Sequence, residues 1–233
     1  MFGGSLWIWV IFIGFTVISW LISHQLKSRF QKYSKIPTAN GMTGRDVVEK
    51  MLRDNGVTGV KIGSVEGMLT DHYNPSKKTL NLSDSVYGSN SVAAIGVAAH
   101  ECGHAIQHQK NYVPLTLRTA IVPVANIGST LAWPLILIGL FFNRSTGAML
   151  INLGILCFSF AVLFQLVTLP VEFNASRRAL HILGEQGILS DSELPYTRKV
   201  LKAAALTYVA SAAAAILQLL RLVLLFGGRN RDD

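Results

Sequence analysis

Residues 148–171 read AMLINLGILCFSFAVLFQLVTLPV and contain no charged side chain. A transmembrane helix needs about 17–25 predominantly apolar residues, so this run is long enough to cross a bilayer. Three further apolar runs cover residues 6–22, 119–142 and 203–227. Pro123 and Pro134 interrupt the second of them, and the sequence leaves open whether it spans fully. We therefore expect a mainly α integral membrane protein with about four transmembrane helices.

Lysine and arginine collect in the segments that follow the first run, precede the second, and separate the third from the fourth. These residues are Lys27, Arg29, Lys32, Lys35, Arg118, Arg177, Arg178, Arg198, Lys199 and Lys202. Such segments are cytoplasmic under the positive-inside rule, so we expect a multi-pass protein of the cell membrane with both termini outside. Contact with anionic lipid headgroups of the bilayer then explains the net charge of +8, and no nucleic-acid partner is needed.

Residues 100–104 read His-Glu-Cys-Gly-His, and the stretch from 91 to 109 around them contains no proline and many small or apolar residues, as a buried helix does. On a helix, residues four apart are separated by about 6 Å of rise and about 40° of rotation, so His100 and His104 project toward one point. We expect them to bind one Zn²⁺ per chain, because a metal partners imidazoles that are costly to bury alone. Glu101 is the predicted general base for metal-activated water.

A catalytic zinc site uses three protein ligands, so one more must come from another part of the chain. We predict Glu172, because it follows the third apolar run and emerges on the cytoplasmic side, where the two histidines also lie. Lys110 excludes the longer metzincin motif, which has histidine at this position. Ser176 lies one turn after Glu172 and could hydrogen-bond a ligand. Weaker candidates for the third ligand are His108, Glu185 and Glu193.

The chain between residues 27 and 118 is long enough for a small α+β domain. Thr43 predicts the N-cap of a helix that stops at Gly56, and residues 57–69 predict one or two strands. Residues 79–83 alternate as an edge strand does, and we expect the substrate to add to this edge as a further strand. His72 could orient the substrate or stabilise the oxyanion. The same role stays open for Tyr196, Tyr208, Arg177 and Arg178.

The expected organisation has five segments. They are a first transmembrane helix over residues 1–26, a cytoplasmic zinc-peptidase domain over 27–118, a transmembrane helical hairpin over 119–171, a cytoplasmic helical segment with the third metal ligand over 172–202, and a fourth transmembrane helix and tail over 203–233.

Several segments together resemble a known family. The run Asp-His-Tyr-Asn-Pro at 71–75, the small residues at 91–94, the motif core at 99–108 and the later Glu172 look like the YugP-type neutral zinc metallopeptidases of bacterial membranes. The chain is more distantly similar to HtpX and the CAAX prenyl proteases, integral membrane gluzincins whose third ligand lies in a Glu-x-x-Ala-Asp pattern. Here Ser176 stands in place of that aspartate. The resemblance implies a small zincin-like domain, a cytoplasm-facing zinc endopeptidase and a role in membrane-protein quality control.

Three hypotheses follow. The first is a zinc endopeptidase that hydrolyses peptide bonds of a peptide or membrane-protein substrate near the membrane face. The second is a site-2-type protease with its motif inside a span, and the third is a non-catalytic scaffold that uses zinc to staple the domain to the bundle. The substrate, the cleavage preference, the oligomeric state and any protein partner are unknown from the sequence.

Overall fold

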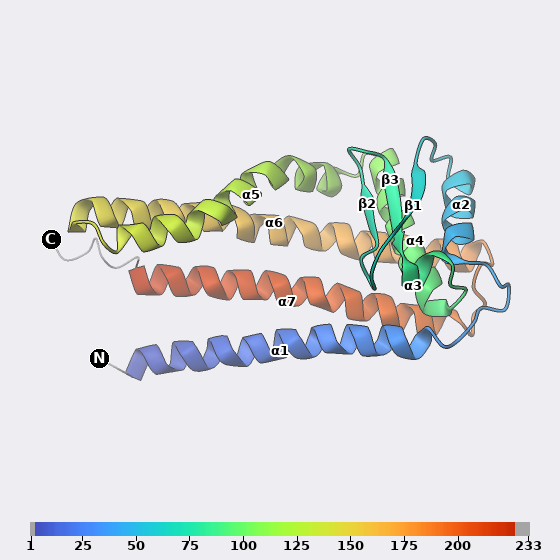
Figure 1. The fold of residues 1–233 in the computed structure, drawn as a ribbon, viewed down its shortest axis with the longest axis horizontal. Coiled ribbons are helices and arrows are strands. Elements are labelled where there is room, and N and C mark those ends of the chain that lie inside the picture. Colours follow the sequence, from blue (N-terminus) through green and yellow to red (C-terminus); the bar gives the residue numbers. More distant parts are fainter. Residues whose placement is uncertain (1–2, 227–233) are drawn as a thin grey trace. The chain divides into compact units, whose positions relative to one another are not determined.

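The computed structural model describes residues 3–226, with side chains from Trp9 onward, and it is mainly helical (Figure 1). Its helices are α1 (Gly3–Tyr33), α2 (Gly44–Asp54), α3 (Asp84–Tyr87), α4 (Val92–Gln109), α5 (Val113–Gly139), α6 (Arg144–Glu185) and α7 (Leu194–Phe226). Its strands are β1 (Lys61–Val65), β2 (His72–Asn74) and β3 (Thr79–Ser83).

Four of these helices, α1, α5, α6 and α7, are long and apolar enough to cross a membrane. They cover the predicted apolar runs except for residues 140–142, which follow the end of α5, so the expected number of candidate spans is confirmed. Residues 227–233, the end of the fourth run and the predicted tail, lie outside the described part of the chain. The helix α6 continues past its apolar run to Glu185, because residues 172–183 contain neither glycine nor proline to stop it. Segment borders predicted at 26 and 171 thus fall inside continuous helices, and the five-segment assignment stays a prediction.

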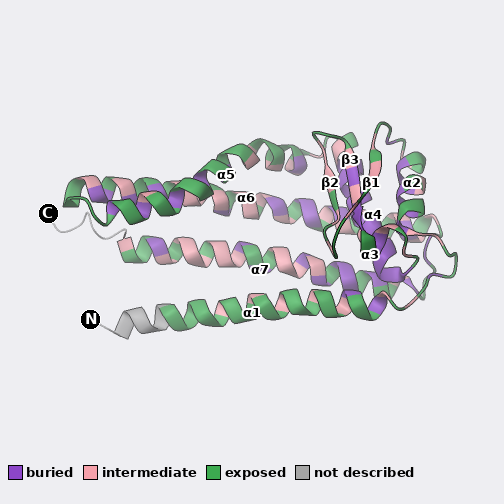
Figure 2. Cartoon of the chain, viewed as in Figure 1, coloured by how far each residue is buried: buried purple, intermediate pink, exposed green. Residues whose placement is uncertain are grey.

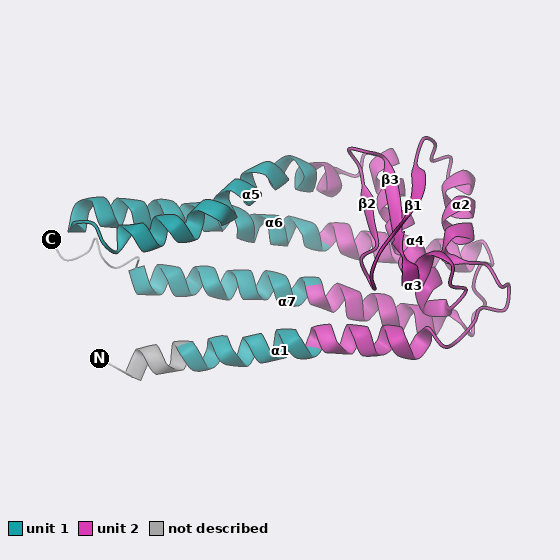
Figure 3. Cartoon of the chain, in the orientation of Figure 1, with its two compact units in different colours: residues 1–21, 117–169, 208–233 teal, residues 22–116, 170–207 magenta. Residues whose placement is uncertain are grey.

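The chain divides into two compact units (Figure 3), of which the first comprises residues 1–21, 117–169 and 208–233 and the second residues 22–116 and 170–207. Within the first unit, Arg221 lies inside the candidate span of α7. Its guanidinium carbon stands 4.1 Å from the centroid of the Trp9 ring and 5.1 Å from that of Phe12. Aromatic faces attract a cation, so these rings accommodate the one charge in the apolar run 203–227.

The second unit contains a three-stranded sheet with the order β1-β3-β2. Strand β3 pairs in parallel with β1 and antiparallel with β2. Residues 79–83 are a strand as predicted, but the prediction that they form an edge is wrong. Their neighbour β2 is only three residues long, too short to give a recognisable alternation, and its pairing places β3 in the middle. Leu80 and Leu82 of β3 are accordingly fully buried.

Helix α2 confirms the helix predicted after Thr43. The Thr43 hydroxyl accepts from the Asp46 amide at 3.2 Å, and the Asp46 carboxylate accepts from the Thr43 amide at 2.9 Å, which completes a capping box. Gly56 follows the helix with a φ of +67°, a left-handed conformation that glycine adopts without strain. The apolar face of α2 packs against α4 and consists of Val47, Val48, Met51 and Leu52.

Helix α4 is the centre of the second unit, as the buried residues in Figure 2 show. It begins after the N-cap Ser91, whose hydroxyl accepts from the Ala94 amide at 3.2 Å. Thr197 of α7 donates its hydroxyl proton to the Val92 carbonyl at 2.8 Å and ties the start of α4 to α7. Small side chains let its neighbours approach closely, so the polar side chains on α4 are buried among packed neighbours.

Candidate metal centre

Helix α4 presents two imidazoles to the same point. His100 and His104 are 8% and 7% exposed, and their ring centroids lie 4.8 Å apart with the planes nearly perpendicular at 84°. This arrangement follows from the four-residue spacing, which places both side chains on one face of the helix. Buried imidazoles in an apolar helix require polar partners, and the structure supplies them from α6.

The carboxylate of Glu172, on α6, lies between these imidazoles. Its Oε2 atom is 3.2 Å from Nε2 of His100 and 3.4 Å from Nε2 of His104, and Glu172 is only 3% exposed. Two ligand atoms that each lie about 2.0–2.1 Å from a tetrahedral zinc ion are about 3.3–3.4 Å apart. The three donor atoms all lie within 4.8 Å of one another. The donor set therefore has the size and the chemistry of a zinc site.

Gln107 sets the orientation of His104 and its proton. The Gln107 Nε2 group donates to the Val171 carbonyl at 2.8 Å, and because a carbonyl only accepts, the amide nitrogen must face it. The other amide atom, Oε1, therefore faces Nδ1 of His104 at 3.0 Å. An amide oxygen only accepts, so Nδ1 carries the proton of the imidazole. Neutral His104 consequently presents an unprotonated Nε2 toward Glu172.

Two more residues of α6 support this arrangement. Asn174 accepts a second bond from Gln107 Nε2 at 3.0 Å and a bond from Arg178 Nε at 2.7 Å. Ser176 pairs its hydroxyl with Nδ1 of His100 at 3.0 Å. Each imidazole thus has Nδ1 tied to the protein and Nε2 directed at Glu172, the pattern in which outer-shell bonds orient metal-binding histidines.

This geometry requires a positive charge between the imidazoles and the carboxylate. A lone pair on Nε2 of His104 facing a carboxylate oxygen at 3.4 Å is repulsive unless a proton or a metal ion intervenes. Burial alone lowers the pKa of His104, but the hydrogen bond and the charge of Glu172 outweigh it and hold the pKa above its ordinary value. The site is therefore built to attract a cation.

The distance between α4 and α6 depends on Gly103. A Cβ atom at this position would lie 2.7 Å from the carbonyl oxygen of Ala175, closer than real Cβ contacts allow. Gly103 precedes His104 by one residue, and Ala175 follows Glu172 by three. Any larger residue at 103 would therefore separate the two helices at the level where the histidines meet the carboxylate.

Glu101 lies on α4 beside the cluster and is 8% exposed. Within residues 9–226, no group hydrogen-bonds its carboxylate. Burial raises the pKa of Asp71, although hydrogen bonds from the Ser83 amide and hydroxyl oppose this rise. The negative charge of the nearby Glu101 raises the pKa of Asp71 further. Asp71 thus lies near Glu101 while it anchors the start of β2. Because no donor occupies the Glu101 carboxylate, its lone pairs are available to accept a hydrogen bond from a substrate or a water molecule.

The other candidate residues lie outside this cluster. Both ring nitrogens of His72 have partners, Nδ1 with the Thr70 carbonyl at 2.9 Å and Nε2 with the Asn81 amide at 3.1 Å. His108 pairs Nδ1 with the Tyr73 hydroxyl at 2.8 Å. The weaker ligand candidates are also used elsewhere: Glu185 pairs with His181 at 3.1 Å on the surface, and Glu193 accepts from the Ala39 and Ser190 amides.

Sequence reasoning did not single out Gln107, Asn174 or Gly103. For Gln107 a signal was present, since an amide three residues after His104 in a buried helix needs a partner as much as the imidazoles do. Neither Asn174 nor Gly103 had such a signal, because their roles depend on how α4 and α6 meet. Cys102 is buried and directs its thiol toward the Val48 carbonyl on α2, at 3.7 Å, so its side chain packs between α4 and α2 and away from the cluster.

Sequence similarity to known proteins extends over nearly the whole of this chain. Residues 8–227 match the family described as "Putative neutral zinc metallopeptidase". The chain is 45% identical over 228 residues to the "Putative membrane protease YugP" of Bacillus subtilis (strain 168), and the similarity covers 96% of this chain and 100% of that protein. No solved structure matches the chain. The matched region includes the motif of α4 and the carboxylate of α6 that meets it.

Proposed function

The chain belongs to the neutral zinc metallopeptidase family, and from this premise we propose that it is a membrane-embedded, zinc-dependent endopeptidase. His100, His104 and Glu172 are its metal ligands, and Glu101 is its general base. The observation that carries the proposal is the meeting of two Nε2 atoms and one carboxylate oxygen at 3.2 Å and 3.4 Å, with both Nδ1 atoms tied back to the protein.

The chain's own groups perform the proton transfers. A bound zinc ion supplies a Lewis acid and lowers the pKa of a water molecule it holds to about 7. Glu101 accepts the proton of the attacking water and delivers it to the leaving amine, since its carboxylate is buried and has no competing hydrogen bond from the described residues. Gln107 and Ser176 hold the imidazoles in place while this happens.

The Glu101→Gln variant tests the catalytic role. It keeps the size of the side chain and leaves the metal ligands untouched, so we expect full zinc content and a loss of about 10²–10⁴ in kcat for an unfolded protein substrate such as casein. Glu172→Ala should instead lose zinc together with activity. Retained activity in the first variant would remove Glu101 as the base, and retained zinc in the second would remove Glu172 as a ligand.

The free edge of β2 is the substrate strand we propose in place of β3. The order β1-β3-β2 leaves β2 with one partner, and β2 packs against α4, which carries the motif. An extended substrate would add to this edge by main-chain hydrogen bonds. A photocrosslinker at His72 on β2 should capture substrate in the Glu101→Gln background. The same group at Lys61 on β1, the opposite edge, should not, and equal capture at both would disprove this edge.

We propose the cytoplasm as the side of the active site. The support is the excess of lysine and arginine beside the candidate spans. A membrane-impermeant thiol reagent should label Lys77→Cys, an exposed site on the β2–β3 turn, in inverted vesicles and leave it unlabelled in intact cells. The opposite pattern would reverse the orientation. A quality-control role predicts that cells without the protein degrade misfolded membrane proteins more slowly.

The scaffold and site-2-type alternatives predict different results. A scaffold with a closed zinc site would not bind a hydroxamate, whereas the peptidase should bind it with zinc present. A site-2-type protease would have α4 inside a span, but α4 is not among the candidate spans within the described residues. The unpartnered Glu101 carboxylate favours the peptidase over the scaffold, because a purely structural metal site has no use for it.

A further inference from the structure

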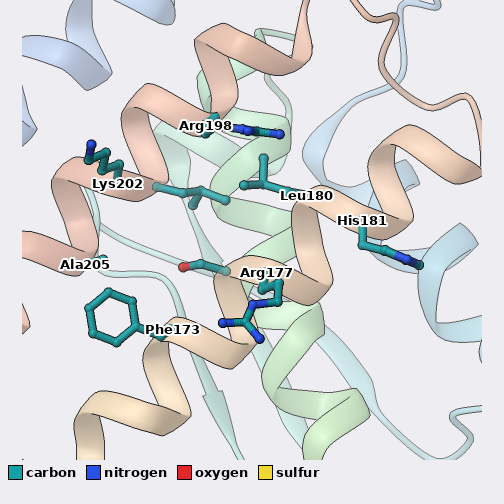
Figure 4. Close-up of a pocket in the computed structure, with 9 residues that line it drawn as sticks. Phe173, Arg177, Leu180, His181, Arg198, Lys202 and Ala205 are labelled. Atoms are coloured by element: carbon teal, nitrogen blue, oxygen red, sulfur yellow. The ribbon is translucent and has the colours of Figure 1, made fainter.

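A cavity of about 530 Å³ lies in the second unit between α6 and α7, and it is separate from the face on which the imidazoles meet Glu172. Its walls are one stripe of each helix: Phe173, Ser176, Arg177, Leu180 and His181 on α6, and Arg198, Leu201, Lys202 and Ala205 on α7. Figure 4 shows Phe173 and Ala205 at one end of this pocket and Arg198 at the other. This volume is typical of ligand pockets in proteins.

Three cations line the pocket without a carboxylate to balance them. Arg177, Arg198 and Lys202 form no ion pair with any residue of the described chain. Arg198 and Lys202 are four residues apart and therefore share one face of α7, opposite Arg177 on α6. All three are exposed, so an anion could reach them from solvent. The charge complement of this pocket is an anionic group such as a phosphate.

The apolar residues of the pocket are ordered along the helices. Phe173 comes two residues after the apolar run that ends at Val171, and Ala205 is the third residue of the run that begins at Ala203. Both lie at the end of the pocket nearest these two apolar runs in sequence, whereas Arg177 and Arg198 lie farther from the runs. Phe173 is 44% exposed, a large ring left for a partner to cover. An occupant therefore needs an apolar part on the span side and an anionic part beyond it.

We propose that this pocket binds an anionic phospholipid, with its phosphate against Arg177, Arg198 and Lys202 and the start of an acyl chain against Phe173 and Ala205. Basic pockets between membrane helices bind lipid headgroups in this manner. A soluble anion would leave the apolar end uncovered. Because Ser176 lines the pocket and also bonds to His100, the lipid would stand directly behind a residue of the metal centre.

The test measures lipid retention on the full-length protein in detergent by native mass spectrometry. Phosphatidylglycerol and phosphatidylcholine with identical acyl chains are titrated separately, and we expect at least about tenfold tighter retention of the anionic lipid. The triple variant Arg177→Gln, Arg198→Gln, Lys202→Gln should lose this preference. The matched control removes three exposed cations beside the first apolar run, Lys27→Gln, Lys32→Gln and Lys35→Gln, and should keep it.

Further variants separate the pocket from surface charge. Ala205→Trp fills the apolar end without a change in charge and should also abolish retention. Phe173→Ser removes the apolar ring from the same end, again without a change in charge, and should weaken retention as well. Zinc content shows that each variant is folded. Because the readout is bound lipid, the test does not depend on peptidase activity. The proposal is overturned if both triple variants lose the lipid equally or if neither does. It is also overturned if Ala205→Trp and Phe173→Ser retain the lipid fully, or if glycerol phosphate or an acidic peptide displaces the lipid at equal concentration.

Discussion

Replacement of Gln107 by leucine probes the positioning of the metal centre most directly. Leucine has about the same size, so the packing of this fully buried position is preserved. The substitution removes the bond that holds the Nδ1 proton of His104 and the two bonds that tie the amide to α6. The proton of His104 is then free to move to Nε2, which blocks that nitrogen as a metal ligand.

The expected loss in zinc affinity can be worked from these contacts. A buried donor left without its acceptor costs about 1–3 kcal/mol, and the Nδ1–H group of His104 becomes such a donor whenever zinc occupies Nε2. The loss of a single outer-shell partner of a metal ligand costs about 10–100-fold in affinity, or about 1.4–2.7 kcal/mol. The two figures agree, so we expect the zinc Kd of Gln107→Leu to rise about 10–100-fold.

The assay is competition with a fluorescent zinc chelator on the detergent-solubilised protein. Thr197→Val is the matched control, because it deletes one buried hydrogen bond to the backbone of α4, at Val92, without a change in the surroundings of the histidines. The control should lose thermal stability and keep its zinc Kd. If Gln107→Leu binds zinc within twofold of the wild type, or if the control weakens zinc as much, the argument from the imidazole proton is refuted.

Three further predictions concern the scaffold around the site. Gly103→Ala should lower the zinc stoichiometry and cost about 1–3 kcal/mol of stability, because its methyl group meets the Ala175 backbone, and unchanged zinc binding would show that the helices can separate freely. Burial raises the pKa of Glu193, but bonds from the Ser190 and Ala39 amides outweigh it and lower the pKa below its ordinary value. The contribution of Glu193 to stability is therefore complete above the pKa of an unfolded glutamate, about 4.3, and is lost as the pH falls through the pKa of the folded state. The melting temperatures of wild type and Glu193→Gln should therefore differ at pH 7 and converge under acid conditions, and a gap that persists would contradict the assignment. Thr43→Ala removes the capping box of α2 and should cost about 1 kcal/mol in denaturant unfolding, with no change in zinc Kd.

Features that depend on neighbouring residues in the chain were predictable before the structure was known. Apolar runs long enough to cross a bilayer predicted the four candidate spans, and four-residue spacing predicted that His100 and His104 share a face, because both depend on helix geometry alone. Thr43 and Ser91 act as caps for the same reason, since a cap involves residues only three positions apart.

Features that depend on the meeting of distant segments required the tertiary structure. The order of the sheet was mispredicted for β3 because a three-residue partner leaves almost no pattern in the chain, and pairing is decided by what the fold brings alongside. Glu172 could be proposed from its place after an apolar run, but its distance from both imidazoles depends on how closely α6 approaches Gly103. The position of the proton on His104 likewise depends on the Val171 carbonyl of α6, which orients the Gln107 amide although the two residues are 64 positions apart in the chain. Local spacing thus specified which groups are available, and helix packing decided which of them lie within bonding distance.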